Sequence, residues 1–325
     1  MVIKIGIIGY KNHAARLLSI LEKKPGVIIN FIYHPTKSLT DSRFTNNFSD
    51  LFNCDAIMIA SPNHTHFEYI RKLLNNDFVG YIFCEKPPVT SLDDFNKLEK
   101  IPLEHKNKIF FNFNLRFSKL SEEIKKQINS QHIGKIIYIN IISSKGLAFK
   151  KEYLGSWRAD GEKNIHNILD TVSIHYIDML NLHFGNIKKS TYIPSLISKN
   201  GTSYDTNQLL LQYDNSVIAS IFNSYATPHI NEILIIGTNG FLTIRNDKLQ
   251  IYSPRDTFDS KGFFTNPPLF QNTDFVIEDD IENSLSNSID FFLSCVKGRK
   301  TIDAVHFNTS LATTSLILQL EQNFL

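Results

Sequence analysis

A lysine at the end of a predicted strand is the residue that points most clearly to chemistry. Lys86 stands in Cys84-Glu85-Lys86-Pro87, after a predicted strand that begins near Gly80. Open α/β sheets bind ligands at the carboxyl ends of their strands, where this lysine would lie. Pro87 restricts the residue before it, so Lys86 would be held in an extended conformation. An ammonium group there can polarise a carbonyl, stabilise an alkoxide or relay a proton.

A histidine and an aspartate form a second candidate group. His175 and Asp178 lie in residues 165–184, whose apolar residues recur with a helical period. Side chains at i and i+3 share one face of a helix, so Asp178 can orient His175 for proton transfer. Thr171 precedes the histidine by four residues, and Asp170 lies one position further away, about 100° round the helix. The segment therefore predicts a general acid or base on a helix.

Alternating strands and helices must position Lys86. Up to residue 118 the sequence alternates short apolar runs with amphipathic segments, which is typical of a doubly wound parallel sheet. The predicted strands are residues 2–8, 27–33, 55–60, 80–84 and 108–113, and the predicted helices are residues 13–24, 64–75 and 91–100. We therefore expect a dinucleotide-binding Rossmann domain over residues 1–118.

The pattern changes after residue 118, where predicted strands follow one another directly. The predicted strands are residues 136–143, 189–195, 204–213, 216–225, 230–237, 240–245 and 248–253; the predicted helices are residues 119–130, 165–184, 280–297 and 303–323; and residues 254–278 are predicted as a loop. We therefore expect an α+β domain over residues 119–325, built on a large, mainly antiparallel open sheet. Its uncovered face would be a usual association surface, so we expect a homodimer or a homotetramer.

A glycine turn ends the first predicted strand. The segment Gly9-Tyr10-Lys11-Asn12-His13-Ala14 follows the dinucleotide-binding pattern G-x-G-x-x-G except at the second glycine, which is Lys11. A helix that begins near Asn12 would direct its N-terminus at a pyrophosphate. Gly9, Lys11 and Asn12 are therefore candidate cofactor-binding residues. The alternative is a strand-to-helix turn that binds no ligand.

The segment after the second predicted strand bears on the choice of dinucleotide. Enzymes that prefer NAD usually carry an acidic residue there that holds the ribose hydroxyls. Here no carboxylate occurs before Asp41, and His34, Thr36 and Lys37 follow the strand instead. Thr36, Lys37 and Arg43 can accept a 2′-phosphate. We therefore expect NADP(H) to be favoured, with NAD(H) as the second option, and His34 can stack on adenine or bind a ribose.

Composition argues against several other classes of protein. The 325 residues include 34 Lys and Arg against 32 Asp and Glu, a net charge of +2, so we expect neither a nucleic acid nor a membrane as partner. No apolar run approaches the roughly 20 residues that a membrane span requires. The three cysteines lack metal-ligand spacing, so we expect no metal site, reduced thiols and a cytoplasmic location.

In this order and spacing the motifs resemble the glucose-fructose oxidoreductase / inositol dehydrogenase family (Gfo/Idh/MocA), from about residue 2 to residue 245. The matching segments are the Gly9 turn, Ser61–His66, Glu85–Pro87, Phe110–Phe117, Trp157-Arg158 and His175–Asp178. The resemblance implies that the turn Ser61-Pro62-Asn63 passes beneath the adenosine and the nicotinamide ribose. It also implies that Glu85 contacts a cofactor ribose and that Lys86 lies near the nicotinamide ring. His66 is a further cofactor candidate, with a local hydrogen bond as its alternative role.

The resemblance also bears on the substrate. The family tends to show a glycine-rich entry and then an Asp or Asn four residues before the histidine, where this chain has Glu162-Lys163-Asn164 and Thr171. The substrate-side candidates are Arg116, Trp157, Arg158 and Thr171. Arg116 either contacts the substrate or ties the domains together, and Trp157 either lines a sugar-binding cleft or packs in a core.

Three hypotheses follow from these residues. The first is an NAD(P)-dependent oxidoreductase that moves a hydride between the nicotinamide and a hydroxyl or keto carbon of a sugar, a cyclitol or a nucleotide-linked sugar. Lys86 would be its electrophile or proton relay, and His175 its general acid or base. The second is a non-catalytic ligand-binding or regulatory protein, which Lys11 and the altered segment around residue 162 favour. The third is a reductase of another carbonyl or of an imine.

Overall fold

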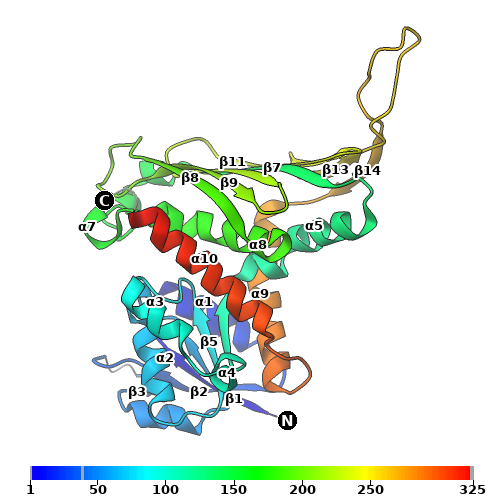
Figure 1. Ribbon diagram of the computed structural model, residues 1–325. Coiled ribbons are helices and arrows are strands. Elements are labelled where there is room, and N and C mark those ends of the chain that lie inside the picture. The colour runs from blue at the N-terminus through cyan, green and yellow to red at the C-terminus, as the bar shows by residue number, and fades with distance from the viewer. Residues whose placement is uncertain (1, 38–39, 323–325) are drawn as a thin grey trace. The chain divides into compact units, whose positions relative to one another are not determined.

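Two compact units make up the chain. The computed structural model describes residues 2–37 and 40–322 (Figure 1). The first unit joins Met1–Asn114 to Leu285–Leu318, and the second joins Leu115–Ser284 to Gln319–Leu325. The predicted division near residue 118 assigned everything beyond it to one domain, whereas the contacts of residues 285–318 group them with the first unit.

A parallel sheet forms the centre of the first unit. Its six strands have the order β3-β2-β1-β4-β5-β6, and neighbouring strands are parallel. They are β1 (Ile3–Ile8), β2 (Val27–Tyr33), β3 (Phe44–Thr45), β4 (Ala56–Ile59), β5 (Tyr81–Glu85) and β6 (Ile109–Asn112). The central strands β1, β4 and β5 and the edge strand β6 are almost continuously buried, as strands covered on both faces are. The predicted doubly wound sheet is confirmed, and its strand order reverses between β1 and β4, where such sheets bind ligands.

Helices from both ends of the chain pack on this sheet. They are α1 (Asn12–Leu21), α2 (His66–Leu74), α3 (Leu92–Glu99) and α4 (Leu103–Lys106), together with the parts of α9 (Ile277–Val296) and α10 (Ala304–Gln322) that fall within residues 285–318. Phe292 of α9 packs against Phe83 of β5 and Phe110 of β6, with ring centroids 5.3 Å and 5.9 Å apart. Because aromatic rings bury a large apolar area, this contact attaches α9 to the parallel sheet.

An eight-stranded sheet forms the second unit. Its order is β14-β13-β12-β11-β7-β10-β9-β8; β7 and β10 are parallel, and the other neighbouring pairs are antiparallel. The strands are β7 (Ile136–Ser144), β8 (Ile187–Ser195), β9 (Thr206–Tyr213), β10 (Ile218–Ser224), β11 (Ile230–Gly237), β12 (Phe241–Arg245), β13 (Lys248–Tyr252) and β14 (Leu269–Asp274). The helices are α5 (Lys119–Ser130), α6 (Lys151–Leu154), α7 (Gly161–Asn164) and α8 (Ile174–Phe184). The predicted α+β architecture is confirmed.

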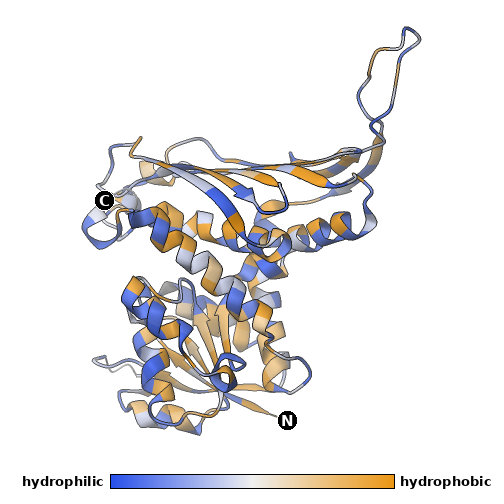
Figure 2. Ribbon diagram, in the orientation of Figure 1, coloured by the Kyte–Doolittle hydropathy of each residue, from blue (hydrophilic) through white to orange (hydrophobic). Residues whose placement is uncertain are grey.

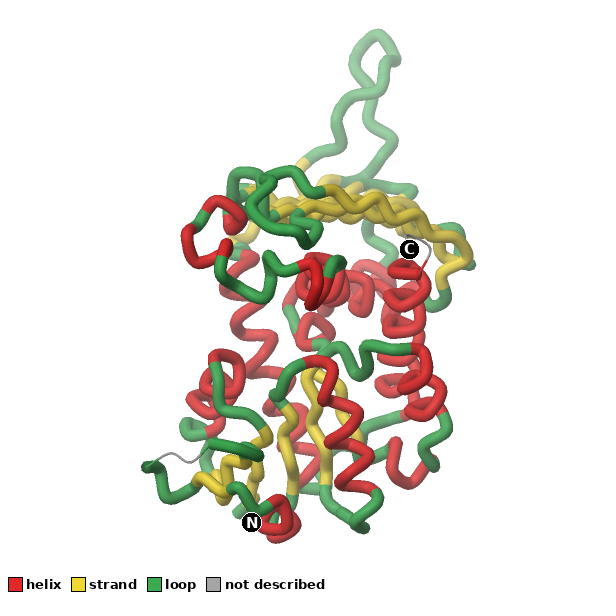
Figure 3. Tube along the Cα trace, turned by 90° about the vertical axis from the view of Figure 1, so that its left-hand side faces the viewer, coloured by secondary structure: helices red, strands yellow, loops and turns green. Residues whose placement is uncertain are grey.

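The two faces of this sheet differ. Helices α5 and α8 lie along one face (Figure 1, Figure 3). Ile139 and Ile141 of β7 are buried there, in register with Ile235 and Ile233 of β11. On the opposite face Leu210 of β9 is 47% exposed. Figure 2 shows apolar residues along these strands, and alternation along each strand places Leu210 and Leu234 on the face that the helices of this unit do not cover.

Two local features depart from the predictions. Strand β14 lies inside residues 254–278, which were predicted as a loop, and a hairpin with a bridge between Phe258 and Phe264 projects beyond the sheet (Figure 1). This edge strand is exposed on both faces, so its sequence shows no alternation of apolar and polar residues. The predicted helix over residues 165–184 contains a π-helical turn, Leu169–Ser173. Neither feature has a periodic signal in the sequence.

A buried ion pair anchors α8 within the second unit. Arg116 donates from Nε to Oδ2 of Asp178 and from Nη2 to Oδ1, each at 2.6 Å. The side chains are 2% and 0% exposed. Two parallel bonds between a guanidinium and a carboxylate hold the two groups in a defined geometry. Desolvation of both charges means that either one becomes costly when its partner is removed.

We expect Arg116→Met to lower the free energy of unfolding by about 3–5 kcal/mol, because Asp178 is left buried without its cation. The double variant Arg116→Met/Asp178→Leu should recover most of this loss, since no charge remains buried. Urea unfolding followed by circular dichroism measures both, with the surface variant Lys126→Ala as control. A single variant within 1 kcal/mol of the wild type, roughly the contribution of an exposed pair, would contradict this account.

Candidate functional site

The turn after β1 leaves no room for a side chain. Gly9 has a φ of 109°, and a Cβ there would lie 2.6 Å from the carbonyl oxygen of Ala60, at the end of β4. Glycine is the residue that tolerates both conditions. Lys11, with an extended backbone, caps α1, which begins at Asn12, and the Asn12 side chain lies outside the described part of the structure. Because the first N–H groups of a helix lack intrahelical partners, this turn is suited to hold a phosphate.

The loop after β2 is organised by His34. Its Nδ1 accepts hydrogen bonds from the backbone N–H groups of Thr36 (3.2 Å) and Lys37 (3.0 Å). The Nζ of Lys37 lies 5.4 Å from the ring centroid of Tyr10, and the side chains of Thr36 and Lys37 are exposed. Partial burial, then the charges of Lys37 and Lys11, lower the pKa of His34. The loop therefore presents a neutral imidazole beside a lysine.

Arg43 does not join this group. Its guanidinium binds Asp41 at 2.7 Å and Glu22 at 2.8 Å. The two carboxylates neutralise it, so the predicted contribution of Arg43 to a 2′-phosphate site has no support in its contacts. The same pairing neutralises Asp41, the first carboxylate after β2.

His66 joins the turns that follow β4 and β5. Its Nδ1 lies 2.8 Å from the carbonyl oxygen of Pro87, and its Nε2 lies 3.0 Å from that of Ser61. The ring is 1% exposed, and burial lowers the pKa of His66 although both carbonyls favour the protonated form. Both ring nitrogens thus bind backbone, which gives His66 a structural function beside the cofactor contact predicted for it. The turn that it holds at Ser61 continues into Pro62 and Asn63.

Glu85 at the end of β5 is buried as an anion. Its Oε1 accepts a hydrogen bond from Nδ2 of Asn112 (2.8 Å) and lies 2.7 Å from Nε2 of His13. Burial alone would raise its pKa, but His13, through its charge and hydrogen bond, and Asn112 bring the pKa of Glu85 down to about 2. Glu85 in turn raises the pKa of His13. Half-buried Lys86 follows, with a cis peptide bond to Pro87.

Sequence reasoning missed His13 as a site residue. In the dinucleotide-binding pattern it occupies a variable position, and the pattern assigns no chemistry to it. Its position in the first turn of α1, at the carboxyl edge of the sheet, was the available signal. The contact with Glu85 became visible only when β1 and β5 were placed in one sheet.

In the second unit, the structure brings Asp178 to Arg116, as described above. Asp178 was predicted to orient His175, and Arg116 was a substrate candidate. Arg116 donates two hydrogen bonds to Asp178. His175 is half-buried at the start of α8. Direct roles of Arg116 and Asp178 toward a substrate or His175 stay predictions.

The π-helical turn before α8 changes the setting of Thr171 and Asp170. The backbone N–H of Ile174 bonds to the carbonyl of Leu169, five residues back, which identifies the π geometry. Thr171 donates to the carbonyl of Asn167 (2.6 Å). Such turns insert one residue into a helix and often occur at functional sites. The helical spacing assumed from the sequence therefore does not hold across this turn.

Asp170 is buried and pairs with a second, half-buried carboxyl group. It is 6% exposed, accepts a hydrogen bond from Nδ2 of Asn164 (2.7 Å) and is hydrogen-bonded to Glu321 of α10. Burial, and then the neighbouring Asp170, raise the pKa of Glu321 well above its usual range. Two carboxyl groups that are hydrogen-bonded to each other share a proton. No sequence pattern linked these residues, because they come from distant parts of the chain.

Trp157 and Arg158 lie together beside Tyr225. The Cζ of Arg158 is 4.7 Å from the ring centroid of Trp157, and its side chain is hydrogen-bonded to Tyr225. Trp157 is 41% exposed, which argues against the core role left open for it. Thr171 shares a hydrogen bond of 2.8 Å with the Tyr225 hydroxyl. Two of the predicted substrate-side residues, Arg158 and Thr171, therefore bind one tyrosine, and Trp157 stacks on the first of them.

The part of the chain that the structure describes contains neither a metal-binding group nor a membrane-spanning helix. No group of three His, Cys, Asp or Glu side chains there is arranged to hold a metal ion. No helix among the described residues is both long enough and apolar enough to cross a membrane.

Comparison with known proteins agrees with the geometry. Residues 3–113 match the model of the oxidoreductase family with an NAD-binding Rossmann fold, and residues 121–243 match the Gfo/Idh/MocA C-terminal domain. Inositol 2-dehydrogenase of Rhizobium meliloti is 25% identical, over 81% of this chain and 76% of that protein. The oxidoreductase YteT of Bacillus subtilis is 26% identical, over 48% of this chain and only 36% of that protein.

A solved structure shows the same fold. An oxidoreductase from Agrobacterium radiobacter, in complex with NAD⁺, L-tartaric acid and magnesium, has a TM-score of 0.77 at 17% identity, over 100% of this chain and 98% of that chain. Since the two family models together span more than half of the sequence, they establish the relationship independently of this fold. The chain belongs to the Gfo/Idh/MocA family of oxidoreductases, whose N-terminal domain is an NAD-binding Rossmann fold.

Proposed function

We propose that this protein is a nicotinamide-dependent oxidoreductase that moves a hydride between the cofactor and a hydroxyl or keto carbon of a sugar, a cyclitol or a nucleotide-linked sugar. The observation that carries the proposal is Lys86 at the end of β5, beside Glu85, a buried carboxylate held ionised. An inositol dehydrogenase among the relatives supports the substrate class.

The residues around the β1–α1 turn fit a dinucleotide. Gly9 removes the side chain where backbone must approach a pyrophosphate, and Lys11 adds a cation at the start of α1. Glu85 is ionised, so it can accept hydrogen bonds from ribose hydroxyls. Ser61 is fixed next to this turn through His66.

The reaction needs a proton acceptor as well as a hydride acceptor. When bound, the nicotinamide supplies the hydride chemistry. In oxidation, the substrate hydroxyl loses its proton as its carbon loses a hydride, which leaves a carbonyl. We assign His175 as the base that takes the proton, and Lys86 as the cation that stabilises the developing alkoxide or relays the proton. In reduction, His175 returns the proton to the alkoxide oxygen. Asp178, bound to Arg116, is a positioning residue of the His175 helix.

Lys86→Ala should abolish turnover and leave cofactor affinity within about tenfold, roughly 1.4 kcal/mol. His175→Asn should lower kcat by roughly 10²–10⁴-fold, the usual effect of losing a positioned proton-transfer group. Nicotinamide absorbance measures turnover, calorimetry measures cofactor binding, and Lys126→Ala is the surface control. Wild-type turnover in Lys86→Ala would remove this lysine from the mechanism. Unchanged kcat in folded His175→Asn would do the same for the histidine.

We further propose that NADP(H) is favoured over NAD(H). Thr36 and Lys37 are exposed after β2, and the first carboxylate beyond them, Asp41, is bound to Arg43. A lysine attracts a 2′-phosphate, whereas a carboxylate would repel it. Lys11 adds charge in the same direction.

Lys37→Ala should weaken NADPH binding by roughly 10- to 100-fold, equivalent to about 1.5–3 kcal/mol, and leave NADH binding nearly unchanged. Paired calorimetric titrations of the wild type and the variant with both dinucleotides measure the ratio. Tighter binding of NADH by the wild type, or the same ratio in both proteins, would refute the preference. Failure to bind either dinucleotide would favour the non-catalytic hypothesis instead.

A non-catalytic ligand-binding protein is the second candidate function. Lys11 occupies the place of a glycine, and Glu162-Lys163-Asn164 replaces a glycine-rich entry, which are the two observations that favour it. Such a protein would bind NADPH without transferring a hydride. A scan of sugars, cyclitols, other carbonyls and imines, followed by nicotinamide absorbance, separates it from both the proposed oxidoreductase and a reductase of another carbonyl or imine.

We also propose that the protein forms a homodimer or a homotetramer through the helix-free face of the eight-stranded sheet. Leu210 and Ile218 on this face are 47% and 37% exposed, and Leu234 lies in the same register row as Leu210. An apolar sheet surface of this kind is usually buried by a second copy. A cytoplasmic location is proposed as well, on the ground that Cys54, Cys84 and Cys295 are buried free thiols.

The double variant Leu210→Glu/Leu234→Glu should be a folded monomer, because four charges would face one another across a two-fold interface. Light scattering coupled to size-exclusion chromatography measures the mass. Val79→Glu, at an exposed apolar residue of the first unit, is the control and should keep the wild-type mass. An unchanged oligomer in the double variant would exclude this face as the interface.

A further inference from the structure

Two cations of the second unit meet at the end of a parallel strand pair. Lys145 follows β7, and Tyr225 follows β10. Because these strands are paired in parallel, their carboxyl ends lie side by side, and the backbone N–H of Lys145 donates to the carbonyl of Ser224 (2.9 Å). Arg158 reaches the same place, since its side chain is hydrogen-bonded to Tyr225.

Tyr225 connects the members of this group. The ring is 3% exposed, and the Nζ of Lys145 lies 5.9 Å from its centroid. Its hydroxyl shares a hydrogen bond of 2.8 Å with Thr171, a predicted substrate-side residue. We call Lys145, Arg158, Thr171 and Tyr225 the cationic cluster. It combines two positive charges with two hydroxyl groups.

The charges of this cluster are not balanced by acids. Within the described chain, neither Lys145 nor Arg158 forms an ion pair with a carboxylate. Burial, then the charges of Arg158 and Lys150, lower the pKa of Lys145. Burial and then the charge of Asp205 raise the pKa of neighbouring Tyr153. The oxygens of Asp205 already accept four hydrogen bonds, from the backbone N–H groups of Ile197 and Ser198 and from the hydroxyls of Ser198 and Thr206. Lys145 is exposed and Arg158 is half-buried, and an anion that binds between them would offset the repulsion of their charges.

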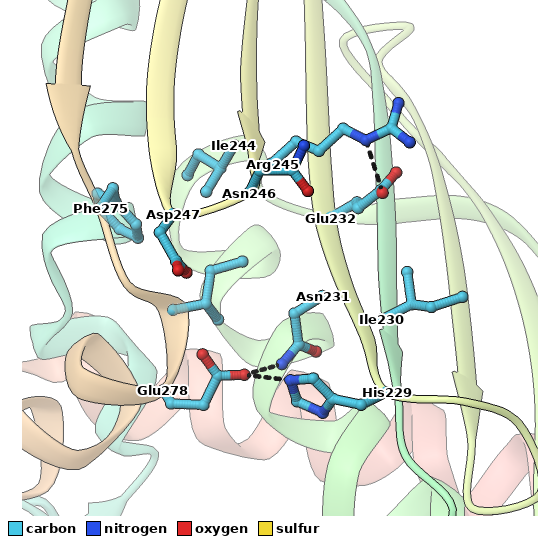
Figure 4. A pocket seen from close by; sticks show the side chains of 11 residues that line it. His229, Ile230, Asn231, Glu232, Ile244, Arg245, Asn246, Asp247, Phe275 and Glu278 are labelled. Carbon is cyan, nitrogen blue, oxygen red and sulfur yellow. Dashed lines mark hydrogen bonds and ion pairs between the residues drawn. The ribbon is translucent and has the colours of Figure 1, made fainter.

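Another charged pocket of the same unit shows the opposite arrangement. A cavity of about 200 Å³ lies between the β11–β12 region and the start of α9 (Figure 4). There Arg245 binds Glu232 at 2.9 Å, and His229 binds Glu278 at 3.0 Å. Since these cations already have carboxylate partners, nothing in that pocket favours the binding of an anion.

We propose that the substrate carries an anionic oxygen group, a carboxylate or a phosphate, that binds between Lys145 and Arg158. The proposal rests on the oxidoreductase function proposed above and narrows its substrates to sugar acids or phosphorylated sugars. Arg158 can bind two oxygens of such a group at once, whereas Lys145 acts as a point charge. The Tyr225 hydroxyl shares a hydrogen bond with Thr171, and the bond from Arg158 to Tyr225 holds this guanidinium at the site.

The single tryptophan of the chain provides a direct test of binding. Trp157 stacks on Arg158, so an anion that moves this guanidinium should change tryptophan fluorescence. Glucose, glucuronate and glucose 6-phosphate are titrated at constant ionic strength. We expect tryptophan fluorescence to change saturably with glucuronate or with glucose 6-phosphate. The sugar that binds identifies the anionic group as a carboxylate or a phosphate. Glucose should bind at least tenfold more weakly.

Variants identify the residues that bind the anion. Lys145→Gln and Arg158→Gln should each weaken binding of the preferred anion by roughly 10- to 100-fold, the usual effect of losing a charged hydrogen bond. Lys126→Gln is the matched control, because this surface lysine of α5 already binds Glu123, and the variant should bind the anion as the wild type does. Equal binding of all three sugars, no saturable change with either anion, or unaltered affinity in both cluster variants would overturn the proposal.

Turnover separates failure of this inference from failure of the proposed function. Oxidation of neutral sugars or cyclitols with NADP⁺, at a kcat/KM that Lys145→Gln leaves unchanged, would refute the anionic substrate and leave the oxidoreductase intact. Absence of hydride transfer with every substrate would refute the oxidoreductase and with it the assignment of the bound anion as substrate.

Discussion

The close approach of two turns at the middle of the parallel sheet is the constraint on which the first unit depends. Gly9 ends β1 with a positive φ, and a Cβ there would collide with the carbonyl of Ala60 at the end of β4. Because the turns must touch, α1 begins directly above the sheet edge and Ser61 lies beside it. His66 then extends the same constraint to Pro87, and so to Lys86 before it. One packing requirement thus positions three loops of the candidate site.

Buried charge is compensated in three ways in this molecule. Glu85 is balanced by a histidine, Asp178 by an arginine with two parallel bonds, and Asp170 by a proton shared with Glu321. Each arrangement avoids an isolated charge in a low-dielectric interior, which would cost several kcal/mol. The cationic cluster around Tyr225 differs, because its positive charges face one another. That contrast is the physical basis for assigning an anion to the substrate.

The helix that carries His175 shows the limit of pattern-based prediction. A period of 3.6 residues puts Thr171 on the face of His175 and Asp170 about 100° away. The π-helical turn Leu169–Ser173 invalidates this geometry, because it accommodates an extra residue. The apolar pattern on either side keeps a helical period, so a single inserted residue leaves no signal in it. Thr171 instead bonds to Tyr225, and Asp170 to Asn164 and Glu321.

The sequence by itself determined most strands of both sheets, the glycine turn and the position of Lys86 at a strand end. Buried apolar runs, alternation and turn residues are local signals, and the chain obeys them nearly everywhere. Tertiary structure alone decided the partners: His13 with Glu85, Arg116 with Asp178, and Lys145 with Arg158 beside Tyr225. It also decided that residues 285–318 join the first unit. The reason is that an amphipathic helix specifies an apolar face but not the surface that covers it. Hydrogen bonds between residues far apart in the sequence likewise depend on distances that no local pattern encodes.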